Sequence, residues 1–151
     1  MGDLDPDSVA RAAAFGQVDF EERTVVTGEF GKGIEHNLDL GEMLVRNVST
    51  DIRSQYGGTE DRGNSIFIFE VAGLCIGHLG HLHHKLTESH YAQIDRLDVV
   101  MVPVDGGLTL THISMRELLD RMRSSVVLPM HVRSAGAMPL FLAHVKDDFA
   151  I

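Results

Sequence analysis

The sequence predicts an α/β (α+β) fold in which covering helices pack on a mixed β-sheet. Two patterns indicate this. Alternating and β-branched segments separated by glycine turns occupy much of residues 24–79, as in antiparallel hairpins. Two continuous apolar runs, Val99–Val104 and Val126–Met130, have helical patterns between and before them, as expected for strands buried on both faces of a parallel sheet. We therefore expect hairpins first and a β-α-β-α-β arrangement after them.

The first third of the chain contains several short elements by its pattern. Asp7–Phe15 is rich in alanine and begins near aspartates that can cap a helix. Thr24–Thr27 is β-branched, Ile34–Leu40 alternates imperfectly, and Met43–Val48 reads as a strand. Residues 51–64 are polar and glycine-containing, so we expect a long loop there.

The remaining elements follow in order. The segment from Ser65 to Leu79 has the strongest hairpin pattern, with a turn at its centre. A short helix is expected from Thr87 to Arg96. Ser114 with Glu117 three residues later forms a capping-box pattern and predicts the start of a second helix. The apolar segment from Leu140 to Val145 predicts a final strand.

Composition limits the class of protein. The chain has 151 residues, of which 44% are hydrophobic, so residues 1–151 are expected to form a single domain with a sizeable core. The formal net charge is −9, which disfavours nucleic acid and an anionic membrane surface as partners.

The cellular location is predicted from the lack of a membrane-spanning or secretory segment in the sequence. No apolar run approaches the roughly 18 residues that span a bilayer, and the start of the sequence is acidic, unlike a secretory signal. Cys75 is the single cysteine, so no internal disulfide can form. We expect a cytoplasmic protein in which Cys75 is a core residue.

Histidine is unusually dense in one segment. The chain has nine histidines, and four of them, including His81, His83 and His84, fall within seven residues. Dense histidine is a signature of metal binding. An extended loop would place His81 and His83 on the same side. His131 and Asp105 each come at or just after the end of a predicted buried strand, so both are candidates to lie near this cluster.

Three stretches together resemble a known family. They are Arg62–Glu70, then Ile76–His84 followed by Leu97–Val104, and finally Val126–His131. Their order and spacing are similar to the second half of the metallo-β-lactamase superfamily, in its branch of small metal-dependent hydrolases related to the ascorbate-6-phosphate lactonases. The resemblance runs from about Val45 to Arg133.

This resemblance implies one half of a four-layer αβ/βα sandwich, in which two similar halves pack sheet against sheet. It also implies a dinuclear metal centre, usually zinc, at one edge, where the metals make a hydroxide nucleophile from bound water. His131 falls on a metal-ligand position. His81 falls on the position of a bridging aspartate, and an imidazole has one lone pair where a carboxylate can hold two metals. The family's His-x-His-x-Asp-His motif is absent, and Ser49-Thr50-Asp51 stands where another histidine ligand is usual.

Three functional readings follow from these residues. The first is a metal-dependent hydrolase of small molecules such as lactones, phosphoesters or amides, with His81, His83, His84 and His131 as metal ligands and zinc, iron or manganese as the metal. The second is a non-catalytic half-domain, truncated or divergent, that oligomerises or binds a partner. The third is a metal-binding or storage protein. Unless residues 1–50 cover the inner sheet face, we expect a homodimer or larger homo-oligomer.

Overall fold

A computed structural model describes residues 35–54 and 56–151 of the chain. The helix predicted over Asp7–Phe15 and the strand predicted over Thr24–Thr27 lie outside the described residues. Within them, no helix is long and apolar enough to cross a membrane.

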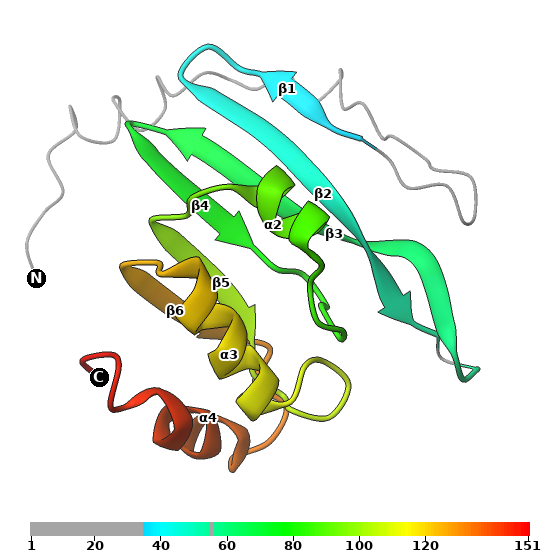
Figure 1. The fold of residues 1–151 in the computed structure, drawn as a ribbon, viewed down its shortest axis with the longest axis vertical. Coiled ribbons are helices and arrows are strands. Elements are labelled where there is room, and N and C mark those ends of the chain that lie inside the picture. The colour runs from blue at the N-terminus through cyan, green and yellow to red at the C-terminus, as the bar shows by residue number, and fades with distance from the viewer. Residues whose placement is uncertain (1–34, 55) are drawn as a thin grey trace, which may run out of the picture.

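Six strands form one mixed sheet, and their order in space is their order in the chain (Figure 1). The first four pair antiparallel, whereas β4, β5 and β6 pair parallel. The predicted mixed sheet with helices packed on it is therefore confirmed. The strands are β1 (Asn37–Asp39), β2 (Met43–Arg53), β3 (Thr59–Val71), β4 (Leu74–His78), β5 (Val99–Pro103) and β6 (Val126–Met130).

The predicted hairpin from Ser65 to Leu79 is confirmed as the β3–β4 pair. Val71 pairs with Leu74, so Ala72 and Gly73 form a two-residue turn. Both turn residues have positive φ, +52° at Ala72 and +77° at Gly73, as a type I′ turn requires. This turn matches the right-handed twist of the strands that it joins.

The loop predicted over residues 51–64 is wrong for most of its length, because only the stretch between Arg53 and Thr59 lies outside the strands. β2 continues to Arg53 and β3 begins at Thr59, with Arg53 opposite Thr59 and a bulge near Asp51. The side chains here are polar because this distal end of the hairpin is largely exposed. Backbone hydrogen bonds between the strands do not depend on apolar side chains, so the polar composition concealed a strand.

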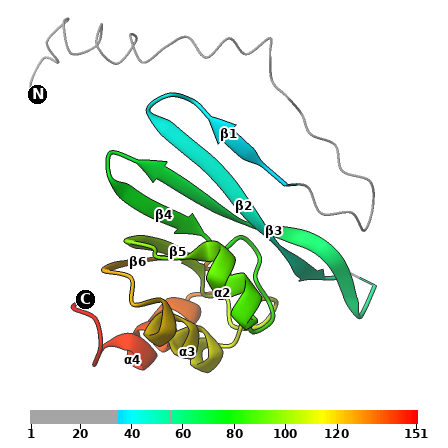
Figure 2. The ribbon, with the colours of Figure 1, turned by 45° about the horizontal axis from the view of Figure 1, so that its top comes forward.

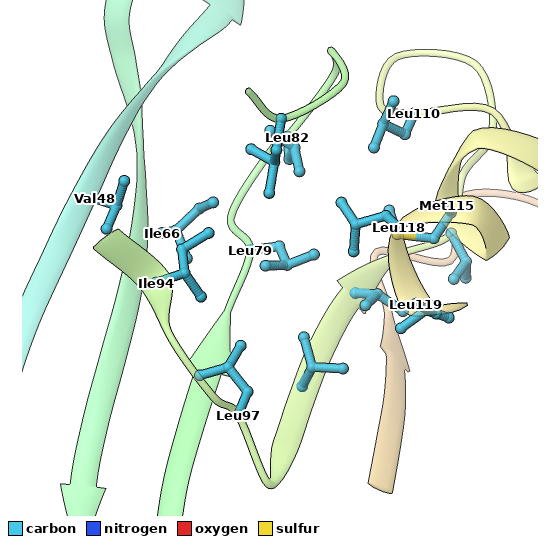
Figure 3. Close-up of a cluster of buried hydrophobic side chains, with 14 of the residues drawn as sticks. Val48, Ile66, Leu79, Leu82, Ile94, Leu97, Leu110, Met115, Leu118 and Leu119 are labelled. Carbon is cyan, nitrogen blue, oxygen red and sulfur yellow. The ribbon is translucent and has the colours of Figure 1, made fainter. Parts of the chain in front are cut away.

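Three helices follow the hairpins and lie on one face of the sheet (Figure 2). Helix α2 (Glu88–Ile94) connects β4 to β5, α3 (His112–Met122) connects β5 to β6, and α4 (Ala137–Val145) follows β6. Figure 3 shows the core between these layers, with Ile66 of β3 and Leu119 of α3 almost fully buried.

Two further predictions of local structure are wrong. Residues Leu140–Val145 belong to α4 and not to a strand; a short apolar run fits a buried helix as well as a strand. Helix α3 begins at His112, and its cap is Thr111, whose side chain accepts the backbone N–H of Ser114. Ser114 is therefore inside the helix that it was predicted to cap.

The two faces of the sheet differ. Side chains at Ile66, Ile68 and Val100 are fully buried beneath the helices. The alternate residues point to the opposite face, which none of the described helices covers (Figure 2). We call this surface the open face and define it by six apolar residues, which are Phe67, Phe69, Ile76, Met101, Val126 and Leu128.

Candidate functional site at the ends of three parallel strands

Three polar side chains meet just beyond the carboxyl ends of neighbouring strands. His81 follows β4, Asp105 follows β5 and His131 follows β6. Because these strands are parallel, their carboxyl ends share one edge of the sheet. That edge is where open α/β sheets commonly bind ligands.

His131 is held by Asp105, as expected from their positions in the sequence. The His131 Nδ1 atom lies 3.1 Å from Asp105 Oδ2. The rings of His81 and His131 are close, with centroids 4.7 Å apart and planes at 89°. The Asp105 side chain is only 3% exposed, while that of His131 is 32% exposed. The imidazole of His131 is therefore partly exposed to solvent, while the carboxylate that is hydrogen-bonded to it is buried.

Asp105 is ionised at neutral pH despite its burial. Burial raises the pKa of this carboxyl, but hydrogen bonds from the backbone N–H groups of Gly107, Thr109 and Leu108 and from His131 outweigh that effect and lower the pKa to about 2. The three backbone donors lie 2.8–3.1 Å from Oδ1. The carboxylate therefore accepts a hydrogen bond from Nδ1–H of His131. The other ring nitrogen, Nε2, is then the one with a lone pair.

The backbone at His131 is in the left-handed region, with φ +60°. For a residue with a side chain, this conformation costs on the order of 1 kcal/mol. Such strain persists where the surrounding contacts impose it, and it occurs often at functional sites. His131 lies directly after β6, and its side chain is hydrogen-bonded to Asp105.

His81 is positioned by a residue that sequence reasoning missed. The backbone N–H of His81 donates to Oδ1 of Asn64, at 2.7 Å. Asn64 is buried, and its Nδ2 group donates to Thr50 Oγ1 at 2.7 Å and to the Leu79 carbonyl at 3.2 Å. Gly80 has φ +61°, and a Cβ atom there would lie 2.3 Å from Asn64 Oδ1. In the sequence, Asn64 is a polar residue just before the alternating apolar segment of β3. That position was the signal from which its role could have been predicted.

Burial lowers the pKa of His81, and the neighbouring His131 lowers it further, while Asp105 opposes the change. The imidazole of His81 is therefore neutral at physiological pH. A neutral imidazole keeps one lone pair, which is the form that binds metal ions.

His83 and His84 form a separate pair, with ring centroids 5.2 Å apart. His84 Nε2 accepts the backbone N–H of Asp51 at 3.2 Å, and Nδ1 donates to the Lys85 carbonyl at 2.9 Å, so both nitrogens are engaged. Nδ1 of His83 is buried without a hydrogen-bond partner, and burial, followed by the nearby His84, lowers the pKa of His83.

The four histidines expected to bind metal are thus brought together in two pairs, His81 with His131 and His83 with His84. Among residues 35–54 and 56–151, no group of three or more His, Cys, Asp or Glu side chains is arranged to hold a metal ion. Asp105 directs its oxygens to His131 and to backbone amides, so it supports the site and adds no donor to it.

Three other histidines make hydrogen bonds with structural roles. The ring of His90 accepts the Thr87 N–H while the Thr87 hydroxyl accepts the His90 N–H, which closes a capping box on α2. His78 lies in β4, and its Nδ1 accepts the N–H of Gly80. His112 lies 2.9 Å from the Val104 carbonyl through Nε2.

A polar hollow of about 540 Å³ lies elsewhere, beside β2 and α2, with Arg46, Asp51 and His90 among its lining residues. Neither His81 nor His131 lines it. At the strand ends, one imidazole is hydrogen-bonded to a buried carboxylate and lies beside a second, neutral imidazole. These residues indicate a specific chemistry, whereas the hollow is recognised by its shape alone, so we place the site at the strand ends.

Comparison with known proteins gives a match for most of the sequence. Residues 9–131 match a family model described as a beta-lactamase superfamily domain. No curated protein matches the sequence. Solved structures do match, and they carry the same fold.

One is from Thermotoga maritima and is described as a Zn-dependent hydrolase of the metallo-beta-lactamase superfamily; it has 27% identity and a TM-score of 0.54, and the match covers 69% of this chain and 48% of that one. The metallo-beta-lactamase fold protein YhfI from Bacillus subtilis has 11% identity and a TM-score of 0.57, with 76% and 47% covered. Igni18, a metallo hydrolase from Ignicoccus hospitalis, has 17% identity and a TM-score of 0.54, with 81% and 53% covered. The chain therefore spans about half the length of these structures.

Proposed function

Because the chain belongs to the family of beta-lactamase superfamily domains, we propose that it is a metal-dependent hydrolase domain in which His131 and His81 are metal donors. One observation carries this proposal. His131 is hydrogen-bonded to the buried carboxylate of Asp105, and His81 lies beside it, at the shared edge of three parallel strands.

The arrangement of His131 is one that metal-binding histidines use. A carboxylate that accepts the proton of one ring nitrogen fixes the tautomer and the orientation of the ring, and it makes the other nitrogen a better donor. Asp105 does this at Nδ1 of His131. The low pKa of Asp105 keeps this support ionised over the whole physiological pH range.

The donor set fits a zinc ion in kind and does not fit the superfamily's two-metal centre in number. Imidazole nitrogen is a usual zinc donor, but a catalytic zinc ion has three protein ligands. His81 and His131 supply two. The described residues by themselves therefore do not complete such a centre, and we assign to this chain the binding and orientation of a divalent ion by two imidazoles.

The finer parts of the proposal follow the resemblance. We propose zinc ahead of iron or manganese, and a small-molecule lactone, phosphoester or amide as substrate, as in the lactonase-related branch. We keep His83 as a further candidate donor because its Nδ1 is buried without a partner, whereas both nitrogens of His84 are engaged. A cytoplasmic location remains part of the proposal.

A second candidate is a non-catalytic domain of the same family. The observation that favours it is His81 itself, which stands where the resemblance places a bridging aspartate. A neutral imidazole has one lone pair and cannot hold two metal ions as a carboxylate does.

Zinc binding by the full-length chain distinguishes these candidates. We would strip the protein of metal and titrate it with zinc by calorimetry, comparing wild type with His131→Ala, His81→Ala and the matched control His144→Ala. The proposal predicts that both site variants lose binding at least about 10-fold and that the control binds as wild type does. Wild-type protein that binds no zinc would overturn the proposal.

Hydrolysis is tested next on the zinc-loaded protein with chromogenic lactone, phosphodiester and amide substrates. Turnover that is lost with a chelator and in His131→Ala supports the hydrolase. Zinc binding without turnover of any substrate supports the non-catalytic domain.

A further inference from the structure

We propose that the open face of the sheet is the surface on which a second copy of this chain packs, sheet against sheet, about a two-fold axis. The inference goes beyond the proposed function and does not depend on metal binding or hydrolysis.

The open face is apolar and accessible. Leu128 is 43% exposed and Val126 is 45% exposed, both on β6. Leu38 of β1 pairs with Val45 on the same side and is 46% exposed. The three helices pack on the opposite face (Figure 2). The exposed apolar side chains on this side thus lie on both edge strands and at Leu74 of β4. Most of the apolar side chains between them are half-buried, and that of Val45 is buried.

The open face also lacks formal charge. Apart from the distal ends of β2 and β3 beyond Ser49 and before Ser65, the described strand residues that alternate onto this side of the sheet are apolar or are Asn, Ser and His, with no Asp, Glu, Lys or Arg. The whole chain has a formal charge of −9. Two copies repel one another over most of their surfaces, so an uncharged face is where they can approach. In a two-fold contact the same patch meets itself, and an uncharged apolar patch is self-complementary.

The size of the face suits a specific dimer. Five strands at a spacing of about 4.8 Å, with about five residues each at 3.3 Å, span roughly 24 by 17 Å. Two such surfaces give about 800 Å² of sheet plane, and the accessible area is larger because side chains stand out of the pleat. This approaches the roughly 1,000 Å² that a biological interface exceeds.

Light scattering coupled to size-exclusion chromatography tests the proposal on the full-length chain. We expect wild type to be a dimer at about 100 µM. Leu128→Glu introduces two buried carboxylates per dimer and is expected to weaken dimerisation by about 100-fold. Leu38→Glu, at the other edge of the face, is expected to act in the same way. Leu140→Glu on α4, where the leucine is 59% exposed, is the matched control and is expected to leave the dimer intact.

Each outcome decides the proposal. Circular dichroism first establishes that each variant is folded. If one of the two open-face variants is unfolded, the other variant carries the test. Wild type that is monomeric at 100 µM overturns the proposal, and residues 1–34 or another protein would then be the cover to look for. A dimer unaffected by both face variants, or equally lost in the α4 control, overturns the assignment of the open face.

Discussion

Replacing Asn64 with alanine is expected to destabilise the fold and release the loop that carries His81. Asn64 is 7% exposed and makes three hydrogen bonds through its side chain. Each contributes about 1 kcal/mol net, and the variant leaves the Leu79 carbonyl and the His81 N–H without their partner. We therefore expect the free energy of unfolding to fall by about 3 kcal/mol and the melting temperature to fall by about 10 °C.

Urea unfolding of the full-length chain measures this change, followed by circular dichroism. Asn37→Ala is the matched control, because Asn37 is an exposed asparagine in β1, and it is expected to change the unfolding free energy by less than about 0.5 kcal/mol. A loss of less than about 1 kcal/mol in Asn64→Ala would refute the reasoning, because the hydrogen bonds would then not hold the loop.

Three further predictions test local features. Thr111→Ala is expected to cost about 1 kcal/mol of stability by removing the cap of α3, whereas Ser114→Ala is expected to cost less; equal costs in urea unfolding would contradict the assigned cap. Ala72→Gly is expected to stabilise the β3–β4 hairpin by about 0.5 kcal/mol, because glycine adopts φ +52° without the steric penalty of alanine, and a lower melting temperature would contradict this. The pKa of Asp105 is about 2 in the folded protein, below its ordinary 3.8. Its ionisation therefore contributes about 2 kcal/mol of stability, which is present above pH 3.8 and is lost as the pH falls through 2. The difference in unfolding free energy between wild type and Asp105→Asn should shrink between about pH 6 and pH 2.5, and a constant difference would contradict the prediction.

The sequence predicted the sheet best where side-chain pattern and environment agree. The continuous apolar run Val99–Val104 contains strand β5, although only the face of that strand beneath the helices is fully buried and the predicted burial of both faces is wrong. The Ala72-Gly73 turn has the conformation that its position between two strands requires. Where one pattern fits two environments, the prediction failed. Leu140–Val145 is apolar enough for a strand, but the segment forms a helix that begins at Ala137 and has Pro139 in its first turn, where no N–H is needed.

The candidate site shows the same limit in a different form. The positions of Asp105 and His131 after buried strands predicted their proximity, because parallel strands end at a common edge. Local spacing could not tell that His83 and His84 pair with each other and that His81 pairs with His131. That division depends on the buried Asn64, which holds the backbone of His81, and on the Asp51 N–H, which binds His84. Both contacts join residues far apart in the chain.

The agreement between the order of the strands in space and their order in the chain has a consequence for synthesis on the ribosome. Each strand pairs with the one made just before it, so the sheet can grow in one direction as the polypeptide emerges. β2 and β3 can form a hairpin before α2 exists, and each later strand needs only the edge already in place. New strands are added at one edge only, and the opposite edge is the three-residue strand β1. Short edge strands limit wrong pairing with another nascent chain.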